Sequence, residues 1–138
     1  MTSKRIAGIA LLAAFLIVLG LQPGSATVQQ KGKTRSATTK QLMRGLVAPN
    51  CGALKKALAA GDAEKATLYA ALLNEAGHIL MADGRCPSGD WKSGAETLQG
   101  CSKVILAKLK ENDVEGAQSA FTALTKGCGA CHTAHKKK

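Results

Sequence analysis

Four consecutive stretches of the chain repeat apolar residues at spacings of three and four, as amphipathic helices do, and no strand pattern interrupts them. They cover residues 39–60, 63–83 and 90–111, and a fourth stretch that starts after Asn112-Asp113 and continues toward the C-terminus. Aromatic residues make up only 3% of the chain, too few for a sheet-rich core. The sequence therefore predicts an all-α protein, an antiparallel up-down-up-down four-helix bundle.

The apolar residues of each stretch predict the face that it turns toward the core. Pro49 lies inside the first stretch and should kink that helix or divide it in two. Gly61-Asp62 should end the first helix and cap the second, and Asn112-Asp113 should cap the fourth. The predicted core-facing residues are Met43, Leu46, Val47, Asn50, Leu54 and Leu58; then Leu68, Leu72, Ala76 and Ile79, with Tyr69, Leu73 and Leu80 beside them; then Trp91, Ala95, Leu98, Cys101, Ile105 and Leu109; and finally Ala117, Phe121, Leu124, Cys128 and Cys131.

The fourth stretch contains Cys128-Gly129-Ala130-Cys131-His132, and C-x-x-C-H is the attachment sequence for a c-type haem. Two thiols three residues apart lie on one side of a helical turn, where each can form a thioether with a haem vinyl group. The imidazole that follows the second thiol can bind the iron as an axial ligand. We therefore expect one covalent haem c at one end of the bundle, attached to Cys128 and Cys131, with His132 as the proximal iron ligand.

Two other kinds of site use similar residues. A thioredoxin-like dithiol places its C-x-x-C at the start of a helix, where the helix dipole lowers the thiol pKa. Here the motif lies near the end of a helical pattern, where the dipole disfavours a thiolate. A zinc site could use Cys128, Cys131 and either His132 or His135, but no second pair of residues with zinc-ligand spacing lies upstream. Haem attachment is therefore the favoured interpretation.

The N-terminal residues 1–26 have the three parts of a secretory signal peptide. Lys4 and Arg5 are followed by an apolar segment over residues 6–21, and Gly24-Ser25-Ala26 supplies small residues for cleavage. The apolar segment is short for a membrane span, so an uncleaved anchor is the less favoured alternative and no stable membrane insertion is expected. We expect an exported protein, periplasmic or in another compartment outside the cytoplasm, where c-type haem is attached.

Residues 27–38 are polar and basic without periodicity, and they predict a disordered leader ahead of one domain over residues 39–138. This domain resembles the class II cytochromes c, the cytochrome c′ family, which are four-helix bundles with C-x-x-C-H near the end of the last helix. The most specific part is AFTALTKGCGACHTAHK, in which Lys136 is the base four residues after the His. The family usually carries Arg there and an aromatic residue in place of His135. It has neither Pro49 nor three additional cysteines.

The ligand on the other side of the iron should come from the same end of the bundle. Met43, His78, Met81 and Trp91 are all expected there, because the end of the fourth helix lies beside the starts of the first and third and the end of the second. Met43 faces inward about one turn into the first helix, and we expect it to be the second iron ligand. The resemblance implies the same, because six-coordinate class II cytochromes take a Met from this part of the first helix. Met81 is the reserve candidate, and His78 is expected at the surface.

An iron with His and Met ligands suits electron transfer, and this is the expected function. One alternative is an open sixth position that binds small gases such as nitric oxide, as in five-coordinate cytochromes c′. Another is a haem subunit that docks to a larger redox enzyme. No nucleophile–base pair or carboxylate dyad is visible, so we do not expect an enzyme.

Charge is expected to be concentrated at the haem end. The formal net charge is +10, or +8 after removal of residues 1–26. Sorted by expected position along the bundle axis, the haem end has a net charge of +9, the opposite end a net charge of zero, and the middle a net charge of −1 from Glu75, Glu96 and Lys103. We expect an acidic redox partner protein at the haem end. The shortage of aromatic residues argues against nucleic-acid binding. The sequence leaves open whether the chain forms a homodimer. The charged residues assigned to the haem end are Lys31, Lys33, Arg35, Lys40, Arg44, Arg85, Lys92, Lys126 and Lys136 to Lys138, with Asp83 and Asp90.

Three cysteines lie outside the motif: Cys51, Cys86 and Cys101. At 1.5 Å per residue, Cys51 and Cys101 should lie at a similar depth in the first and third helices. A disulfide between them needs Cα atoms within about 7 Å, and the first and third helices are diagonal in a square bundle. The two alternatives are a Cys51–Cys101 disulfide and buried free thiols, with Cys86 unpaired in both.

Overall fold

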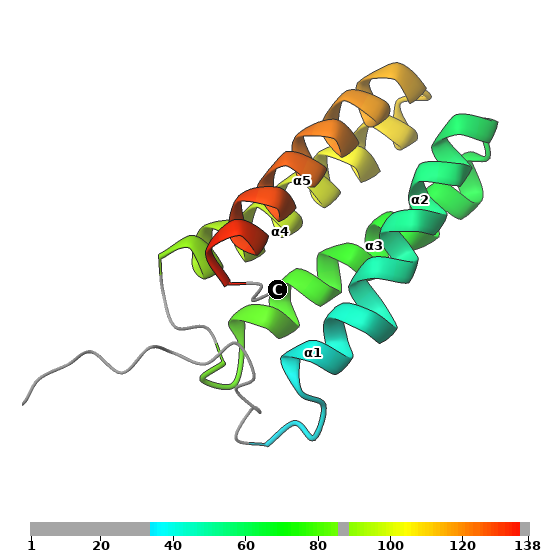
Figure 1. Cartoon of the computed structure of the whole chain (residues 1–138). Helices are drawn as coiled ribbons and strands as arrows, with labels where there is room; N and C mark the ends of the chain where they lie inside the picture. The colour runs from blue at the N-terminus through cyan, green and yellow to red at the C-terminus, as the bar shows by residue number, and fades with distance from the viewer. Residues whose placement is uncertain (1–33, 86–88, 136–138) are drawn as a thin grey trace, which may run out of the picture.

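The structure is a computed structural model that describes residues 34–85 and 89–135, and the chain in these ranges is predominantly helical (Figure 1). The four predicted helical stretches are all present and pack closely, the first of them divided into three parts. The predicted signal peptide, Cys86 and the C-terminal lysines lie outside the described residues. The elements are α1 (Thr39–Leu42), the π-helical turn η1 (Met43–Val47), α2 (Ala48–Ala60), α3 (Ala63–Met81), α4 (Asp90–Lys110) and α5 (Val114–His135).

The first stretch is interrupted just before Pro49, as predicted. Pro49 lies at the start of α2. Its backbone nitrogen carries no hydrogen, so it cannot donate the hydrogen bond that a continuous α-helix needs. The chain passes this point through η1, in which the amide of Ala48 donates to the carbonyl of Met43, five residues back. A π-helical turn admits one extra residue, so the residues before it are rotated relative to a regular helix.

The helix ends follow local signals that the sequence shows. Thr38 and Gln41 form a capping box at the start of α1. Gly61 ends α2 with φ +67°, and the side chain of Asp62 then accepts from the amide of Lys65 at the start of α3. Asp113 caps α5 by accepting from the amide of Gly116 at 2.8 Å. The predicted stop and cap positions in these two connections are confirmed.

Consecutive helices pack against one another along their lengths (Figure 1). Contacts between α3 and α4 show the register, because the indole N–H of Trp91 donates to the carbonyl of Leu80 and the Asn74 amide donates to the carbonyl of Gln99. Residue numbers therefore rise along α4 as they fall along α3. Among the described residues, none of the helices is long and apolar enough to cross a membrane.

The predicted core-facing residues are largely confirmed in α4. In α3, Leu73, Ala76 and Leu80 are buried as predicted, whereas the prediction for Leu68 and Leu72, which are 54% and 37% exposed, was wrong. Small residues make up most of the buried face of α3, where they allow close approach, and Leu68 and Leu72 lie outside the contact. The buried residues of α3 are Ala66, Ala70, Leu73, Ala76, Gly77 and Leu80.

Candidate haem-attachment site

The C-x-x-C-H sequence forms the last turns of α5, so its residues are helical, as predicted. Cys131 is buried against Gly94 of α4, where a Cβ atom would lie 2.7 Å from the Cβ of Cys131. Cys128 is half-buried and His132 is exposed. Because successive residues of an α-helix turn by about 100°, Cys131, Cys128 and His132 span an arc that starts at the α4 side of α5.

The interaction with the Cys51 thiol of α2 is the main reason that the pKa of Cys128 is lowered to about 7, against the opposing effect of burial. The same interaction, followed by burial and the charge of Cys128, raises the pKa of Cys51 far above its usual value.

The third cysteine near this pair is Cys101 on α4. Burial, and then the charge of Cys128, raise the pKa of the Cys101 thiol. Cys51, Cys101 and Cys128 are all free thiols in the structure, so the disulfide alternative for Cys51 and Cys101 was wrong. The physical reason is the order of the helices, because α2 packs on α3 and has its second contact with α5 rather than α4. Within the part of the chain that the structure describes, no group of three or more His, Cys, Asp or Glu residues is placed to hold a metal ion.

A groove of about 660 Å³ lies between α2 and α5, and Cys51 is one of its lining residues. The side-chain amide of Gln118, also in the lining, donates to the carbonyl of Leu58 at 3.2 Å. On α5, Cys128 and His132 follow Thr125 at spacings of three and four, so they continue the wall of the groove toward the end of the helix. The lining residues are Cys51, Gly52, Lys55, Leu58 and Ala59 of α2 and Gln118, Phe121, Thr122 and Thr125 of α5.

The candidate distal ligand, Met43, is the first residue of η1, and it is partly buried against the core. Counted from the hydrogen bond between Gln118 and Leu58 at 1.5 Å per residue, Met43 lies about 22 Å along its helix and His132 about 21 Å along α5. Met43 and His132 are thus at a similar height along the two helices. The reserve candidate, Met81, is also partly buried, and His78 is exposed, as predicted.

His135 is an inward residue that the sequence analysis did not identify. Its ring lies edge-on to the buried Trp91, with ring centroids 5.8 Å apart. Its Nε2 atom is buried and has no hydrogen-bond partner among the described residues. The spacing of four from Cys131 on the buried face of α5 was the available signal.

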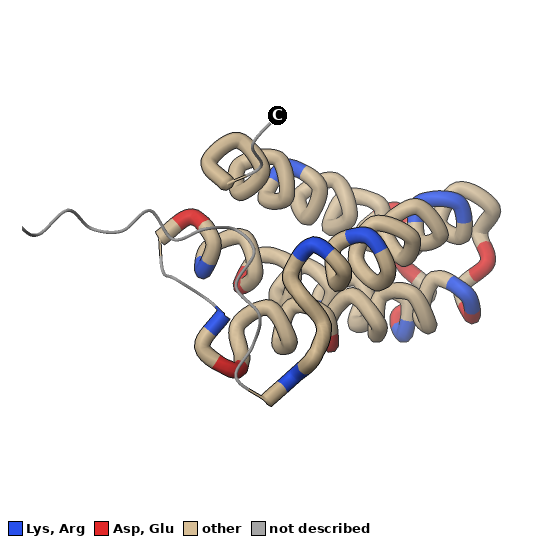
Figure 2. Tube along the Cα trace, turned by 60° about the horizontal axis from the view of Figure 1, so that its bottom comes forward, with Lys and Arg blue, Asp and Glu red and all other residues tan. Residues whose placement is uncertain are grey.

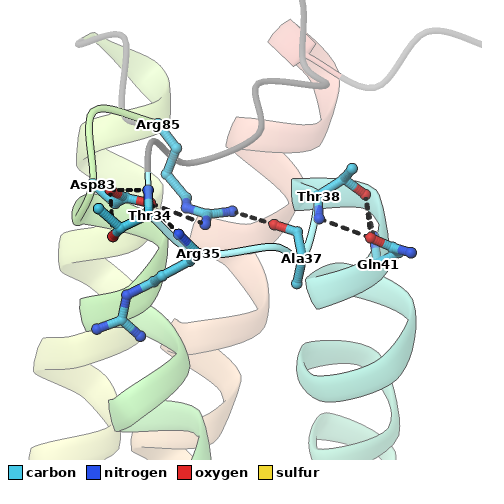
Figure 3. Close-up of polar contacts among 7 residues, drawn as sticks. All are labelled: Thr34, Arg35, Ala37, Thr38, Gln41, Asp83 and Arg85. Atoms are coloured by element: carbon cyan, nitrogen blue, oxygen red, sulfur yellow. Dashed lines mark hydrogen bonds and ion pairs between the residues drawn. The ribbon is translucent and has the colours of Figure 1, made fainter.

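Asp83 and Arg85, after the end of α3, hold the segment that leads into α1 (Figure 3). Arg85 is only 1% exposed, and it donates to the carbonyl of Ala37 at 3.0 Å. Asp83 accepts from the amides of Thr34 and Arg35, and mainly the Arg35 hydrogen bond holds the pKa of Asp83 below its usual value. Arg85 and Asp83 also form an ion pair at 3.8 Å. Arg85 was counted among the charges of the haem end, but its charge is buried and paired with Asp83, so it adds nothing to an exposed basic surface.

No family model matches the chain, and no curated protein or solved structure matches it either. The resemblance to class II cytochromes c therefore stays a prediction from the motif and the helical pattern.

Proposed function

We propose that this chain is an exported c-type monohaem cytochrome that carries electrons, folded as an antiparallel up-down-up-down four-helix bundle with the haem at the end of α5. The observation that carries the proposal is the position of the C-x-x-C-H sequence in the last turns of a packed helix. Cys131 is buried against α4, and Cys128 is partly buried against the core, so both thiols lie on the inward side of α5. A thioredoxin-like dithiol would instead lie at the start of a helix, where the helix dipole lowers the thiol pKa.

The donor set fits a c-type haem. Cys128 and Cys131 would hold the haem through two thioethers, and His132 and Met43 would bind the iron on its two faces. When bound, the iron supplies one-electron redox chemistry whose potential depends on these axial ligands and on burial. The groove between α2 and α5 is lined by other residues of these helices, and none of the four donors is among them.

A second candidate is an iron with an open sixth position that binds a small gas. It differs from the first candidate in whether Met43 binds the iron. The optical spectrum of the purified protein separates the two candidates. We expect a low-spin iron in the wild type, and a high-spin iron with faster carbon monoxide binding in Met43→Ala. A high-spin wild type that binds carbon monoxide readily would favour the gas-binding function.

The charge distribution supports an acidic redox partner at the end where α5 terminates. There the exposed basic residues outnumber the acidic ones, with Arg35, Lys40, Arg44, Lys92 and Lys126 against Asp90. At the opposite end, basic and acidic residues lie side by side (Figure 2), and Lys108 pairs with both Glu111 and Asp113. The net field should therefore attract an anionic surface to the motif end.

Covalent haem attachment is tested by producing the chain together with a c-type haem attachment system and extracting it with acidified acetone. We expect the haem to stay with the protein. In Cys128→Ala and Cys131→Ala, where one thioether is lost, the spectrum of the retained haem should change. In the double variant the haem should be extracted. Free extraction from the wild type would overturn the proposal.

A further inference from the structure

Asp83 and Arg85 lie in a tight turn that directly follows α3. Two consecutive residues of this turn, Asp83 and Gly84, have positive φ angles of +63° and +70°, and the Arg85 amide donates to the carbonyl of Ala82 at 3.3 Å. Positive φ is uncommon for residues other than Gly, and Asp tolerates it better than most. Figure 3 shows that both side chains point from this turn toward residues 34–38, which we call the lead-in segment. The turn therefore presents a carboxylate and a guanidinium to the same short segment.

Asp83 and Arg85 together form an anchor for the lead-in segment. Both carboxylate oxygens of Asp83 accept hydrogen bonds, from the amides of Thr34 and Arg35 at 3.0 Å each. The Nη1 atom of Arg85 donates to the carbonyl of Ala37 at 3.0 Å, and the Arg85 side chain is fully buried. Hydrogen bonds of this kind, in which one partner is charged, are roughly twice as strong as those between neutral groups. The end of α3 thus sets the position of the lead-in segment, although 48 or 49 residues separate the bonded groups along the chain.

The lead-in segment continues directly into the helical turn that precedes Met43. Thr38 caps α1, and Met43 follows the four residues of α1, with its amide donating to the carbonyls of Lys40 and Thr39. A single helical turn is not stable by itself, so the position of α1 depends on its contacts with the rest of the molecule. At the far end of α1, η1 packs on α3, and at the near end the anchor holds the lead-in segment. The position of Met43 therefore depends on the anchor.

We propose that the anchor formed by Asp83 and Arg85 positions Met43, holding it through the lead-in segment and α1 where its sulfur atom can bind the iron. This role rests on the function proposed above, whereas the anchoring of α1 does not. When the anchor is weakened, α1 should separate from the end of α3 and the iron should lose its second ligand. The anchor would then decide between the two candidate states of the iron, one closed by Met43 and one open to a small gas.

Asp83→Asn weakens the anchor most directly, because Asn also tolerates positive φ and should keep the turn. Its amide has one acceptor oxygen instead of two and no negative charge, so the hydrogen bonds to the lead-in segment and the ion pair with Arg85 are weakened. The matched control is Asp113→Asn, which makes the same change at the opposite end of the bundle. There the carboxylate accepts from the amide of Gly116 at 2.8 Å and pairs with Lys108 at 3.1 Å.

Hydrogen exchange of the haem-free chain tests the anchoring of α1. We expect the amides of Leu42 and Met43 to exchange roughly tenfold faster or more in Asp83→Asn than in the wild type, because charge-assisted hydrogen bonds that hold α1 are lost. In Asp113→Asn these amides should exchange as in the wild type. Unchanged exchange in Asp83→Asn, or an equal acceleration in the control, would overturn the proposal. If circular dichroism shows that Asp83→Asn does not fold, Thr34→Ala, which loses only the hydroxyl hydrogen bond to Asp83, takes its place with a smaller acceleration expected.

Carbon monoxide binding by the haem-loaded chain tests the positioning of Met43. The binding rate should rise several-fold in Asp83→Asn, with a shift toward a high-spin spectrum, and stay unchanged in Asp113→Asn. In a Met43→Ala background, Asp83→Asn should cause no further rise, because the ligand that the anchor positions is absent. No rise at all, or the same rise with and without Met43, would overturn the positioning role. If the rate does not respond to Met43→Ala, the ligand assignment fails, and if the chain acquires no haem, the proposed function fails. In both cases hydrogen exchange still decides whether the anchor holds α1.

Discussion

Helix α5 has two lateral contacts, and they differ in how tightly they are packed. Against α4, two glycines remove the side chains that would keep the helices apart: Gly94 faces Cys131, and Gly127 faces Thr97. Against α2, the helices leave a groove of about 660 Å³ that is bridged by the hydrogen bond from Gln118 to Leu58. The comparison indicates that the α2 side of α5 can accommodate a cofactor with less disturbance than the α4 side.

The largest effect is expected from adding one methyl group to the tight contact. In Gly127→Ala the new Cβ atom would overlap the Cγ2 atom of Thr97. Rotation of Thr97 is restrained, because its hydroxyl donates to the carbonyl of Ser93 at 2.8 Å. We expect a loss of about 1–3 kcal/mol in the free energy of unfolding, measured by urea denaturation. Unchanged stability would show that the α4–α5 contact is not tightly packed.

A smaller effect is expected where the open contact is bridged. Gln118→Ala removes the hydrogen bond to the carbonyl of Leu58, and Gln118→Glu keeps the length of the side chain but removes the donor. We expect each variant to lose about 1 kcal/mol of unfolding free energy. A loss confined to the Ala variant would assign the effect to packing instead of the hydrogen bond.

The smallest effect is expected in the wall of the groove, and it has the opposite sign. Gly52 lies within α2, and a Cβ atom at this position would meet no atom within 4 Å. Gly52→Ala should therefore raise the unfolding free energy by about 0.5–1 kcal/mol, because Ala has less conformational freedom in the unfolded chain. It is the matched control for Gly127→Ala. A destabilised Gly52→Ala would mean that this part of α2 is closely covered.

The helices and their ends could be predicted because the signals are local. Gly61, Asp62 and Asp113 act on their own turns, and the interruption before Pro49 follows from the missing N–H of that residue. The C-x-x-C-H motif could likewise be recognised from five consecutive residues.

What could not be predicted depends on how separate helices are rotated against one another. In the sequence, Leu68 and Leu72 form an apolar stripe at helical spacing that is as regular as that of the neighbouring alanines. Close packing nevertheless places the smaller residues in the helix contact. The Cys51–Cys128 pair and the burial of Arg85 each join segments that are distant in the sequence. No local pattern indicates which distant residue such a side chain will meet.

The central claim is that Cys128 and Cys131 carry a haem, and the mass of tryptic peptide 127–136 tests it most directly. The protein is produced with a c-type haem attachment system, and the peptide is fragmented to locate the added mass. We predict one haem on this peptide, bonded to both of its cysteines. The peptides that contain Cys51 and Cys101 should carry no haem. A peptide 127–136 of unmodified mass, from a chain that is folded and helical, would contradict it.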